Sequence, residues 1–129
     1  MRIYGPSLAF FLTVSCSAFG QQATNTPLFQ ADIEDLREQE ALMLTVEYPP
    51  GVASAAHRHN AYVYVYVLVG AVVMQVEGGK RPTLSAGETF YETPGDEHTV
   101  SMNASDTESA KILVFMIKPQ DAPPTVPAH

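Results

Sequence analysis

The stretch from Gly51 to Gly70, GVASAAHRHNAYVYVYVLVG, is the part of the sequence that decides the fold. Its second half, residues 61–69, is a run of β-branched and aromatic residues, which is typical of a strand. Successive side chains of a strand point to opposite faces. The run therefore predicts two faces, with Tyr62, Tyr64 and Tyr66 on one and Val63, Val65 and Val67 on the other.

Short strand patterns continue on both sides of this stretch, separated by turns rich in Gly, Pro and Ser. They cover residues 41–48, 71–77, 81–84, 88–92, 98–102 and 110–118. Many short strands with close turns and little helix predict an all-β fold, either a sandwich or a barrel. Pattern alone does not choose between these two, so the motifs must decide.

The two flanks of the predicted domain have a different composition. Residues 21–30 are polar and 31–40 have a helix-favouring composition, although 31–40 could equally be a loop, so we expect 21–40 to be an N-terminal extension. Residues 119–129 carry four prolines and are expected to form an extended, disordered tail. The predicted domain is therefore residues 41–118.

Residues 1–20 have the order of a secretory signal peptide. Arg2 is followed by an apolar run at 8–14, too short to cross a bilayer, and then by Ala18-Phe19-Gly20 as a cleavage site. A buried N-terminal strand or helix is one alternative, and a lipoprotein anchored through Cys16 is another. Cleavage after Gly20 predicts a secreted or periplasmic chain without cysteine, because Cys16 is the one cysteine of the sequence.

The charge of the chain excludes some classes of partner. Loss of Arg2 with the signal peptide would leave six basic and fourteen acidic residues. Such a surface repels phosphate backbones and anionic lipids. We therefore expect no nucleic-acid partner and no membrane insertion after cleavage, and we expect a small-molecule substrate or ligand instead.

Three of the four histidines stand beside the predicted strands and turns. His57 and His59 are two residues apart, so in an extended chain their imidazoles share a face. His98 follows the Pro94-Gly95 turn and opens a later strand, from which it can meet the other two across a small barrel. Three converging neutral imidazoles suit Zn, Fe, Cu, Ni or Mn and leave coordination positions open. The alternative is that they are chance surface residues or hydrogen-bonded core residues. His129, alone in the tail, is assigned no role.

The spacing within these segments resembles the two motifs of the cupin superfamily. Residues 51–70 match G-x5-H-x-H-x3-E-x6-G at every fixed position except the glutamate, where Val63 stands. Residues 87–103 resemble G-x5-P-x-G-x2-H-x3-N, matching at Gly87, Gly95 and His98. Thr93 takes the proline position and the asparagine is displaced by one, to Asn103.

The resemblance implies a small jelly-roll barrel of six to eight strands, often dimeric, with a divalent metal inside its mouth. By carry-over, His57, His59 and His98 are the metal ligands, and the fourth ligand is absent at Val63. Val63 shares the strand parity of His57 and His59 and should face the interior. A three-His site keeps the full charge of the ion, which favours an anionic ligand.

Some cupins that resemble this arrangement are three-His dioxygenases acting on enolisable or thiol substrates. The resemblance thus implies a metal-dependent dioxygenase, with iron expected first, acting on a small anionic or enolisable substrate. A barrel that binds a metal or small molecule without catalysis is the alternative, because no carboxylate can be placed in the pocket as a general base. Either Tyr91 or Glu92 could face the pocket, since the parity of their strand is open. The three tyrosines of 61–69 are interpreted as core packing or a subunit contact.

Overall fold

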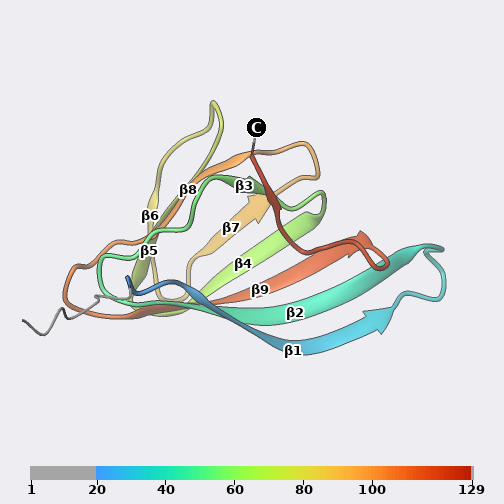
Figure 1. The fold of residues 1–129 in the computed structure, drawn as a ribbon, viewed down its shortest axis with the longest axis horizontal. Coiled ribbons are helices and arrows are strands. Elements are labelled where there is room, and N and C mark those ends of the chain that lie inside the picture. The colour runs from blue at the N-terminus through green and yellow to red at the C-terminus, as the bar shows by residue number, and fades with distance from the viewer. Residues whose placement is uncertain (1–19, 129) are drawn as a thin grey trace, which may run out of the picture.

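The computed structural model describes residues 20–128, which form ten strands in two five-stranded sheets (Figure 1). No helix is present among these residues, so none is long and apolar enough to cross a membrane. The all-β prediction is therefore confirmed. The predicted signal peptide lies almost wholly outside the described residues, as does His129.

All strand pairs within the two sheets are antiparallel, and the chain passes repeatedly from one sheet to the other. The first sheet has the order β1 (Thr24–Asp32), β2 (Gln39–Tyr48), β9 (Ala110–Pro119), β4 (Tyr62–Val69) and β7 (Thr89–Glu92). The second has the order β10 (Val126–Pro127), β3 (His57–Arg58), β8 (His98–Asn103), β5 (Ala71–Val76) and β6 (Thr83–Ser85). From β3 to β9 the sheet changes at almost every connection, which wraps both sheets around one interior.

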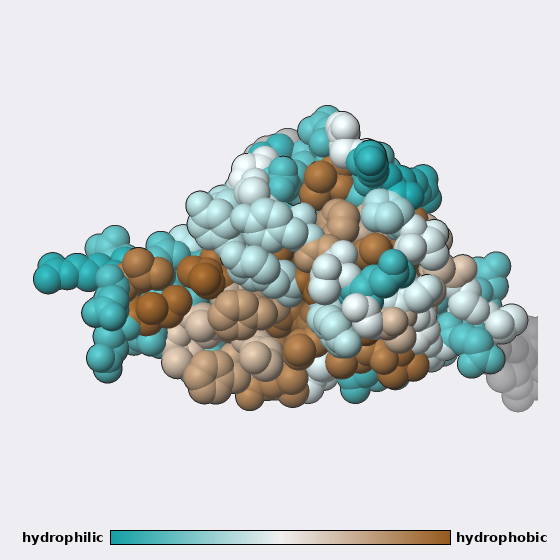
Figure 2. All heavy atoms as spheres, turned by 180° about the vertical axis from the view of Figure 1, so that it is seen from behind, coloured by the Kyte–Doolittle hydropathy of each residue, from teal (hydrophilic) through white to brown (hydrophobic). Residues whose placement is uncertain are grey.

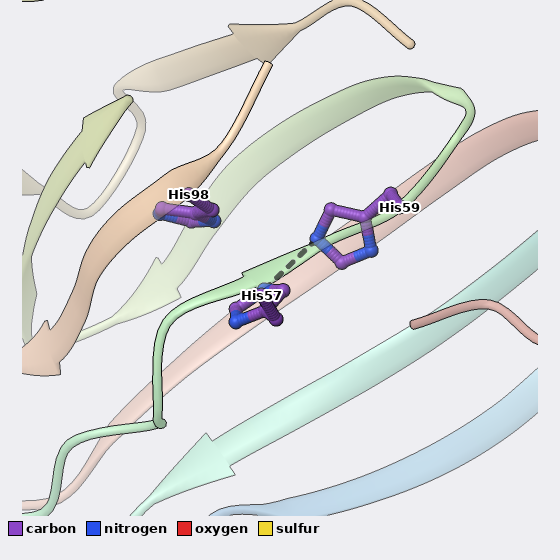
Figure 3. Close-up of side chains that lie close together, drawn as sticks. All are labelled: His57, His59 and His98. Atoms are coloured by element: carbon purple, nitrogen blue, oxygen red, sulfur yellow. Dashed lines mark hydrogen bonds between the residues drawn. The ribbon is translucent and has the colours of Figure 1, made fainter. Parts of the chain in front are cut away.

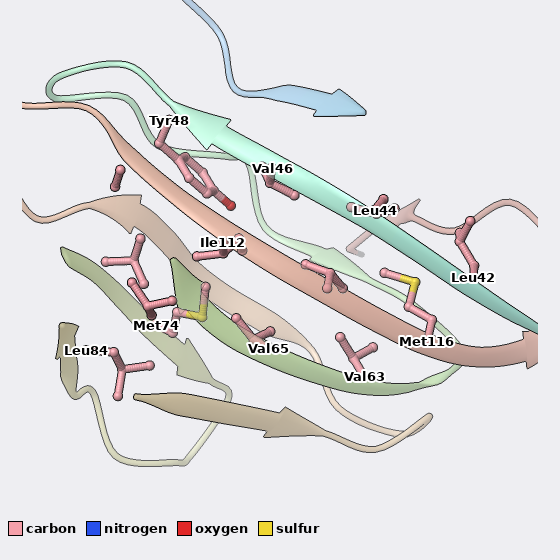
Figure 4. Close-up of a cluster of buried hydrophobic side chains, with 14 of the residues drawn as sticks. Leu42, Leu44, Val46, Tyr48, Val63, Val65, Met74, Leu84, Ile112 and Met116 are labelled. Atoms are coloured by element: carbon pink, nitrogen blue, oxygen red, sulfur yellow. The ribbon is translucent and has the colours of Figure 1, made fainter. Parts of the chain in front are cut away.

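The interior follows from the alternation predicted for β4. Its valines at positions 63, 65 and 67 are 1%, 4% and 0% exposed, whereas its tyrosines are 45–46% exposed. Central strands β2 and β9 alternate in the same way and pack their apolar side chains against those of β4 (Figure 4). The apolar side of this sheet consists of Leu42, Leu44, Val46, Val63, Val65, Val67, Ile112, Val114 and Met116.

The N-terminal extension is part of the first sheet, and the helix considered for residues 31–40 is wrong. Strand β1 pairs with β2 from Thr24 opposite Glu47 to Asp32 opposite Glu40. Most side chains of β1 are exposed, so its pairing rests on backbone hydrogen bonds at the sheet edge. Backbone hydrogen bonds leave no pattern in the side chains, and for this reason the sequence did not predict this strand.

The tail is ordered across the described residues, contrary to the prediction for 119–129. Lys118 Nζ donates a hydrogen bond to the Ala122 carbonyl at 2.6 Å, and strand β10 then pairs with β3. Pro127 lies opposite His57 in that pair. Strand β10 is the edge of its sheet, where a proline without an N–H is tolerated.

The three tyrosines of β4 lie on the outer face of the first sheet. Tyr64 is 5.2 Å from Tyr91 and 6.1 Å from Phe115, measured between ring centroids. Core packing is therefore the wrong interpretation of these residues, and a subunit contact stays a prediction. Seen from behind, the molecule carries its hydrophobic surface mainly on the lower half (Figure 2).

The structure explains why the last position of the first motif, Gly70, is a glycine. Its φ is +71°, a conformation that side-chain-bearing residues rarely adopt. A Cβ at this position would lie 2.7 Å from the Ser109 carbonyl oxygen and 3.1 Å from Ala110 Cα. Both neighbours are backbone atoms at the start of β9, so they cannot move aside cheaply.

Substitution of Gly70 by Ala should therefore destabilise the fold more than the matched change Gly78→Ala. Gly78 has the same φ of +71°, but a Cβ added there would meet nothing within 4 Å, so its substitution carries only the conformational cost, about 1 kcal/mol. Gly70→Ala adds a backbone clash that should cost roughly 1–3 kcal/mol more. Urea denaturation of both variants measures the difference. Equal free energies of unfolding would contradict the close approach of Gly70 to β9.

Candidate metal centre

The structure brings together the three histidines that the sequence singled out (Figure 3). His57 lies in β3 and His98 opens β8, and the two residues are direct partners in the antiparallel pair of these strands. His59 follows β3 and turns its ring toward His57. One nitrogen from each ring lies within 4.8 Å of the others, so the three side chains could hold a metal ion. Whether they bind one stays a prediction.

Backbone carbonyls fix the tautomers of two of these rings. His57 Nδ1 lies 2.7 Å from the Ala55 carbonyl oxygen, and His59 Nδ1 lies 2.8 Å from that of Pro124. A carbonyl can only accept, so in the neutral ring each Nδ1 carries the proton and each Nε2 carries a lone pair. The two Nε2 atoms face each other at 3.1 Å. Two lone pairs at this distance repel unless a cation or a shared proton lies between them.

Burial favours the neutral form of His57. Loss of solvent contact lowers the pKa of His57 below its ordinary value, and nearby His59 and His98 lower the pKa further. The hydrogen bond to Ala55 acts in the opposite direction and is the smaller effect compared with burial. A neutral imidazole is the form that binds a metal ion.

The structure also places a carboxylate in the site, which the sequence could not do. Glu92 on β7 is 2% exposed and points inward, whereas Tyr91 is 49% exposed and points outward. Glu92 Oε1 lies 3.0 Å from His98 Nδ1, and Oε2 lies 3.9 Å from His59 Nε2. Of the two residues considered from the sequence, Glu92 therefore faces the cavity and Tyr91 does not. The alternation of side chains along β7 predicts that Glu92 and Tyr91 face opposite sides. Only the register of β7 against β4 shows which of the two faces the cavity.

Several buried polar atoms of this cluster have no hydrogen-bond partner within residues 20–128. They are Glu92 Oε1 and both ring nitrogens of His98. Oε1 and Nδ1 are close to each other, yet their geometry is not that of a hydrogen bond. Buried polar atoms without a partner are rare, and a missing ion is one of the usual reasons. The donor set of imidazole nitrogens and a carboxylate therefore fits a divalent transition metal.

The cluster lines a cavity of about 810 Å³ in the interior of the barrel. Apolar side chains of β2, β4 and β9 form much of its wall, including Val63, which faces inward as predicted. Phe90 stacks on His98 with ring centroids 5.7 Å apart. The cavity is large enough to hold a small organic molecule beside the histidines.

A second buried charged group lies elsewhere on the same cavity wall. Glu40 and Lys118 form an ion pair with both side chains buried, and Gln30 donates a hydrogen bond to Glu40 at 2.8 Å. The hydrogen bonds from Lys118 and then Gln30 hold the pKa of Glu40 below its ordinary value. Lys118 also donates to the carbonyls of Pro119 and Ala122. This pair therefore fastens the beginning of the tail to the first sheet.

Two other motif residues have structural roles. Arg58 does not line the cavity and pairs with Glu97 at 2.9 Å. Asn103 is buried and its amide nitrogen donates to the carbonyls of Tyr48, Pro49 and Glu108. Asn103 thus holds the loops that follow β2 and β8, even though it is displaced by one position from the motif.

Comparison with solved structures shows the same fold in several proteins. An uncharacterised conserved protein of Klebsiella pneumoniae with a double-stranded β-helix domain is 20% identical, with a TM-score of 0.64, covering 84% of this chain and 85% of that one. An oxalate oxidase in complex with the substrate analogue glycolate is 24% identical, with a TM-score of 0.61, covering 81% and 54%. A DMSP lyase of Ruegeria pomeroyi is 19% identical, with a TM-score of 0.61, covering 68% and 43%.

These likenesses concern the fold, and the chain spans only about half the length of the two enzymes. No curated protein matches the sequence. The family itself is established by the sequence, because residues 44–116 match the model of the Cupin domain, within the 41–118 expected from the strand pattern. With this match, two facing antiparallel sheets and a histidine cluster between them, the chain belongs to the cupin family.

Proposed function

We propose that this cupin binds a divalent transition metal, iron first among the candidates, and acts as a dioxygenase-type oxidoreductase on a small anionic or enolisable substrate. The observation that carries the proposal is the pair of Nε2 lone pairs of His57 and His59, 3.1 Å apart in a buried cluster with His98. A bound ion of this kind would supply Lewis acidity toward the substrate and, for iron, redox chemistry with oxygen.

The chain's own residues would prepare the site in two ways. The carbonyls of Ala55 and Pro124 hold the rings of His57 and His59 with their Nε2 atoms inward. Such orienting hydrogen bonds commonly decide the metal affinity of a histidine site. The apolar side chains of the cavity wall lower the local dielectric constant, which would strengthen electrostatic contacts between the site and a bound anion.

An anionic substrate is supported by the character of the site. The three imidazoles are neutral ligands and do not cancel the charge of an ion. The oxalate oxidase that shares this fold was solved with glycolate, a small carboxylate. We place the anion in the open part of the cavity beside the histidines, in contact with apolar residues such as Val63.

A barrel that binds a metal or ligand without turnover is the second candidate. It is favoured by Val63, which replaces the glutamate of the first motif. Export completes the proposal and is supported by the order of residues 1–20, with cleavage after Gly20. N-terminal sequencing of the exported protein tests that part separately, with Gln21 expected as the first residue.

The untagged protein should contain one equivalent of a first-row transition metal, and the double variant His57→Ala/His98→Ala should contain none. The loss is expected because one remaining imidazole cannot replace three converging ligands. Mass spectrometry of the metal content measures this. His129→Ala is the control and should retain the metal. A wild-type protein that holds no metal after reloading under reducing conditions would remove the basis of the proposal.

Deletion of residues 123–129 should weaken metal binding although every proposed ligand remains. The deletion removes the Pro124 carbonyl that holds His59 and the β10 strand that pairs with β3. Loss of such an orienting contact should reduce affinity roughly 10–100-fold. Competition with a chromogenic chelator measures it. Pro124→Ala retains the carbonyl and should bind like the wild type, whereas an unchanged affinity in the deletion would contradict the role of the tail.

Iron-loaded protein should consume oxygen with at least one member of a panel of diketones, flavonols and thiols. Uptake is expected because the substrate anion and oxygen would both have access to the open side of the site. An oxygen electrode and product analysis measure the reaction, with the His57→Ala/His98→Ala variant as the blank. Tight calorimetric binding of a panel member that is recovered unchanged, with no oxygen uptake from any of them, would instead favour the binding barrel.

A further inference from the structure

A buried carboxylate lies on the strand beside Val63, the position where the first motif has a glutamate. We propose that Glu92 of β7 is the fourth protein ligand of the metal centre, so that the site has three histidines and one glutamate. This inference rests on the proposed metal binding and goes beyond it, because it assigns a ligand that lies outside both the histidine cluster and the motif position of Val63.

The register of the sheet carries the first step. Val63 on β4 and Glu92 on β7 are direct partners in an antiparallel pair. Direct partners point to the same face of a sheet, with Cβ atoms roughly 5 Å apart. The Glu92 carboxylate therefore lies one strand away from position 63, on the same inner face and at the same height along the barrel.

The contacts of Glu92 carry the second step. Its two oxygens approach two different rings, with Oε1 3.0 Å from His98 Nδ1 and Oε2 3.9 Å from His59 Nε2. Ligand atoms that share one ion, each about 2.1 Å from it, lie roughly 3–3.5 Å apart. The 3.0 Å between Glu92 Oε1 and His98 Nδ1 and the 3.1 Å between the Nε2 atoms of His57 and His59 match this range, whereas the 3.9 Å between Glu92 Oε2 and His59 Nε2 is somewhat longer.

Comparison with the other buried carboxylate on the cavity wall carries the third step. Glu40 has a lysine and an amide as partners, and its charge is thereby compensated. Glu92 is equally buried, yet in the described part of the chain the basic groups within 4 Å of its carboxylate are the imidazoles of His59 and His98, with no lysine or arginine among them. Burying a carboxylate without a cationic partner is very unfavourable. A divalent ion bound by the same imidazoles would compensate this charge.

A glutamate ligand changes the expected substrate chemistry. It lowers the net charge of the ion and its ligands from +2 to +1. One carboxylate or enolate then neutralises the site, so we expect selection for a monoanion over a dianion. The position vacated by the motif glutamate is an apolar wall formed by Val63, against which the uncharged part of such a monoanion can lie.

Cobalt(II) is the probe for the experiment, because its affinity and its visible absorption spectrum both report the ligand set. Glu92→Gln should bind Co(II) more than roughly 100-fold more weakly than the wild type, beyond what loss of an orienting contact causes. Its absorption bands should also change. The swap Val63→Glu/Glu92→Val returns the carboxylate to the motif position and should restore affinity to within about tenfold of the wild type.

Glu97→Gln is the matched control. Glu97 precedes His98 in the chain but pairs with Arg58 and does not line the cavity, so this variant should bind Co(II) like the wild type. Circular dichroism checks that each variant is folded. A folded Glu92→Gln variant with unchanged affinity, or with a modest loss and an unchanged spectrum, would overturn the inference while leaving the three-His site intact. Failure of the wild type to bind Co(II) would instead overturn the proposed function and this inference with it.

Discussion

The alternation of side chains along β4 is the constraint on which the core and the site both depend. Its valines at 63, 65 and 67 must face inward because they meet the apolar faces of β2 and β9, and this leaves the tyrosines outside. A shift of one residue in register would exchange the two faces. The same register then determines which residues of β7 point inward, so that Glu92 enters the cavity while Tyr91 leaves it.

The carboxylates and basic side chains buried in the described part of the barrel form two clusters, and these differ in how far their charges are compensated. The Glu40–Lys118 pair is complete, since each charge has a charged partner and further hydrogen bonds. The cluster of His57, His59, His98 and Glu92 is incomplete, because buried nitrogens and an oxygen lack partners within residues 20–128. A complete cluster stabilises a structure, whereas an incomplete one costs free energy until a ligand arrives. This contrast distinguishes the two clusters more clearly than their composition, since both contain buried ionisable groups.

The sequence predicted those parts of the molecule that follow from local periodicity and motif spacing. The two faces of β4 and the convergence of the three histidines belong to this class. Strands β1 and β10 do not, because they are held at sheet edges by backbone bonds that any composition can make. Glu92 does not either, since its place beside His98 depends on the pairing of β7 with β4, which sets Glu92 opposite Val63. Side-chain periodicity gives the face of a residue within its own strand, but only register gives its neighbours on the next strand.

The proposed metal site is assembled from segments that are distant in the sequence. Strand β3 contributes His57, and it pairs with β8 on one side and with β10 on the other. The hydrogen bond between His59 and Pro124 joins residues 65 positions apart. None of these contacts exists in the unfolded chain, so an ion that binds the native cluster adds its binding free energy to the stability of the fold. The tail therefore has two roles: β10 pairs with β3, and the Pro124 carbonyl orients His59. We expect that folding of the tail onto the barrel raises the affinity of the cluster for an ion.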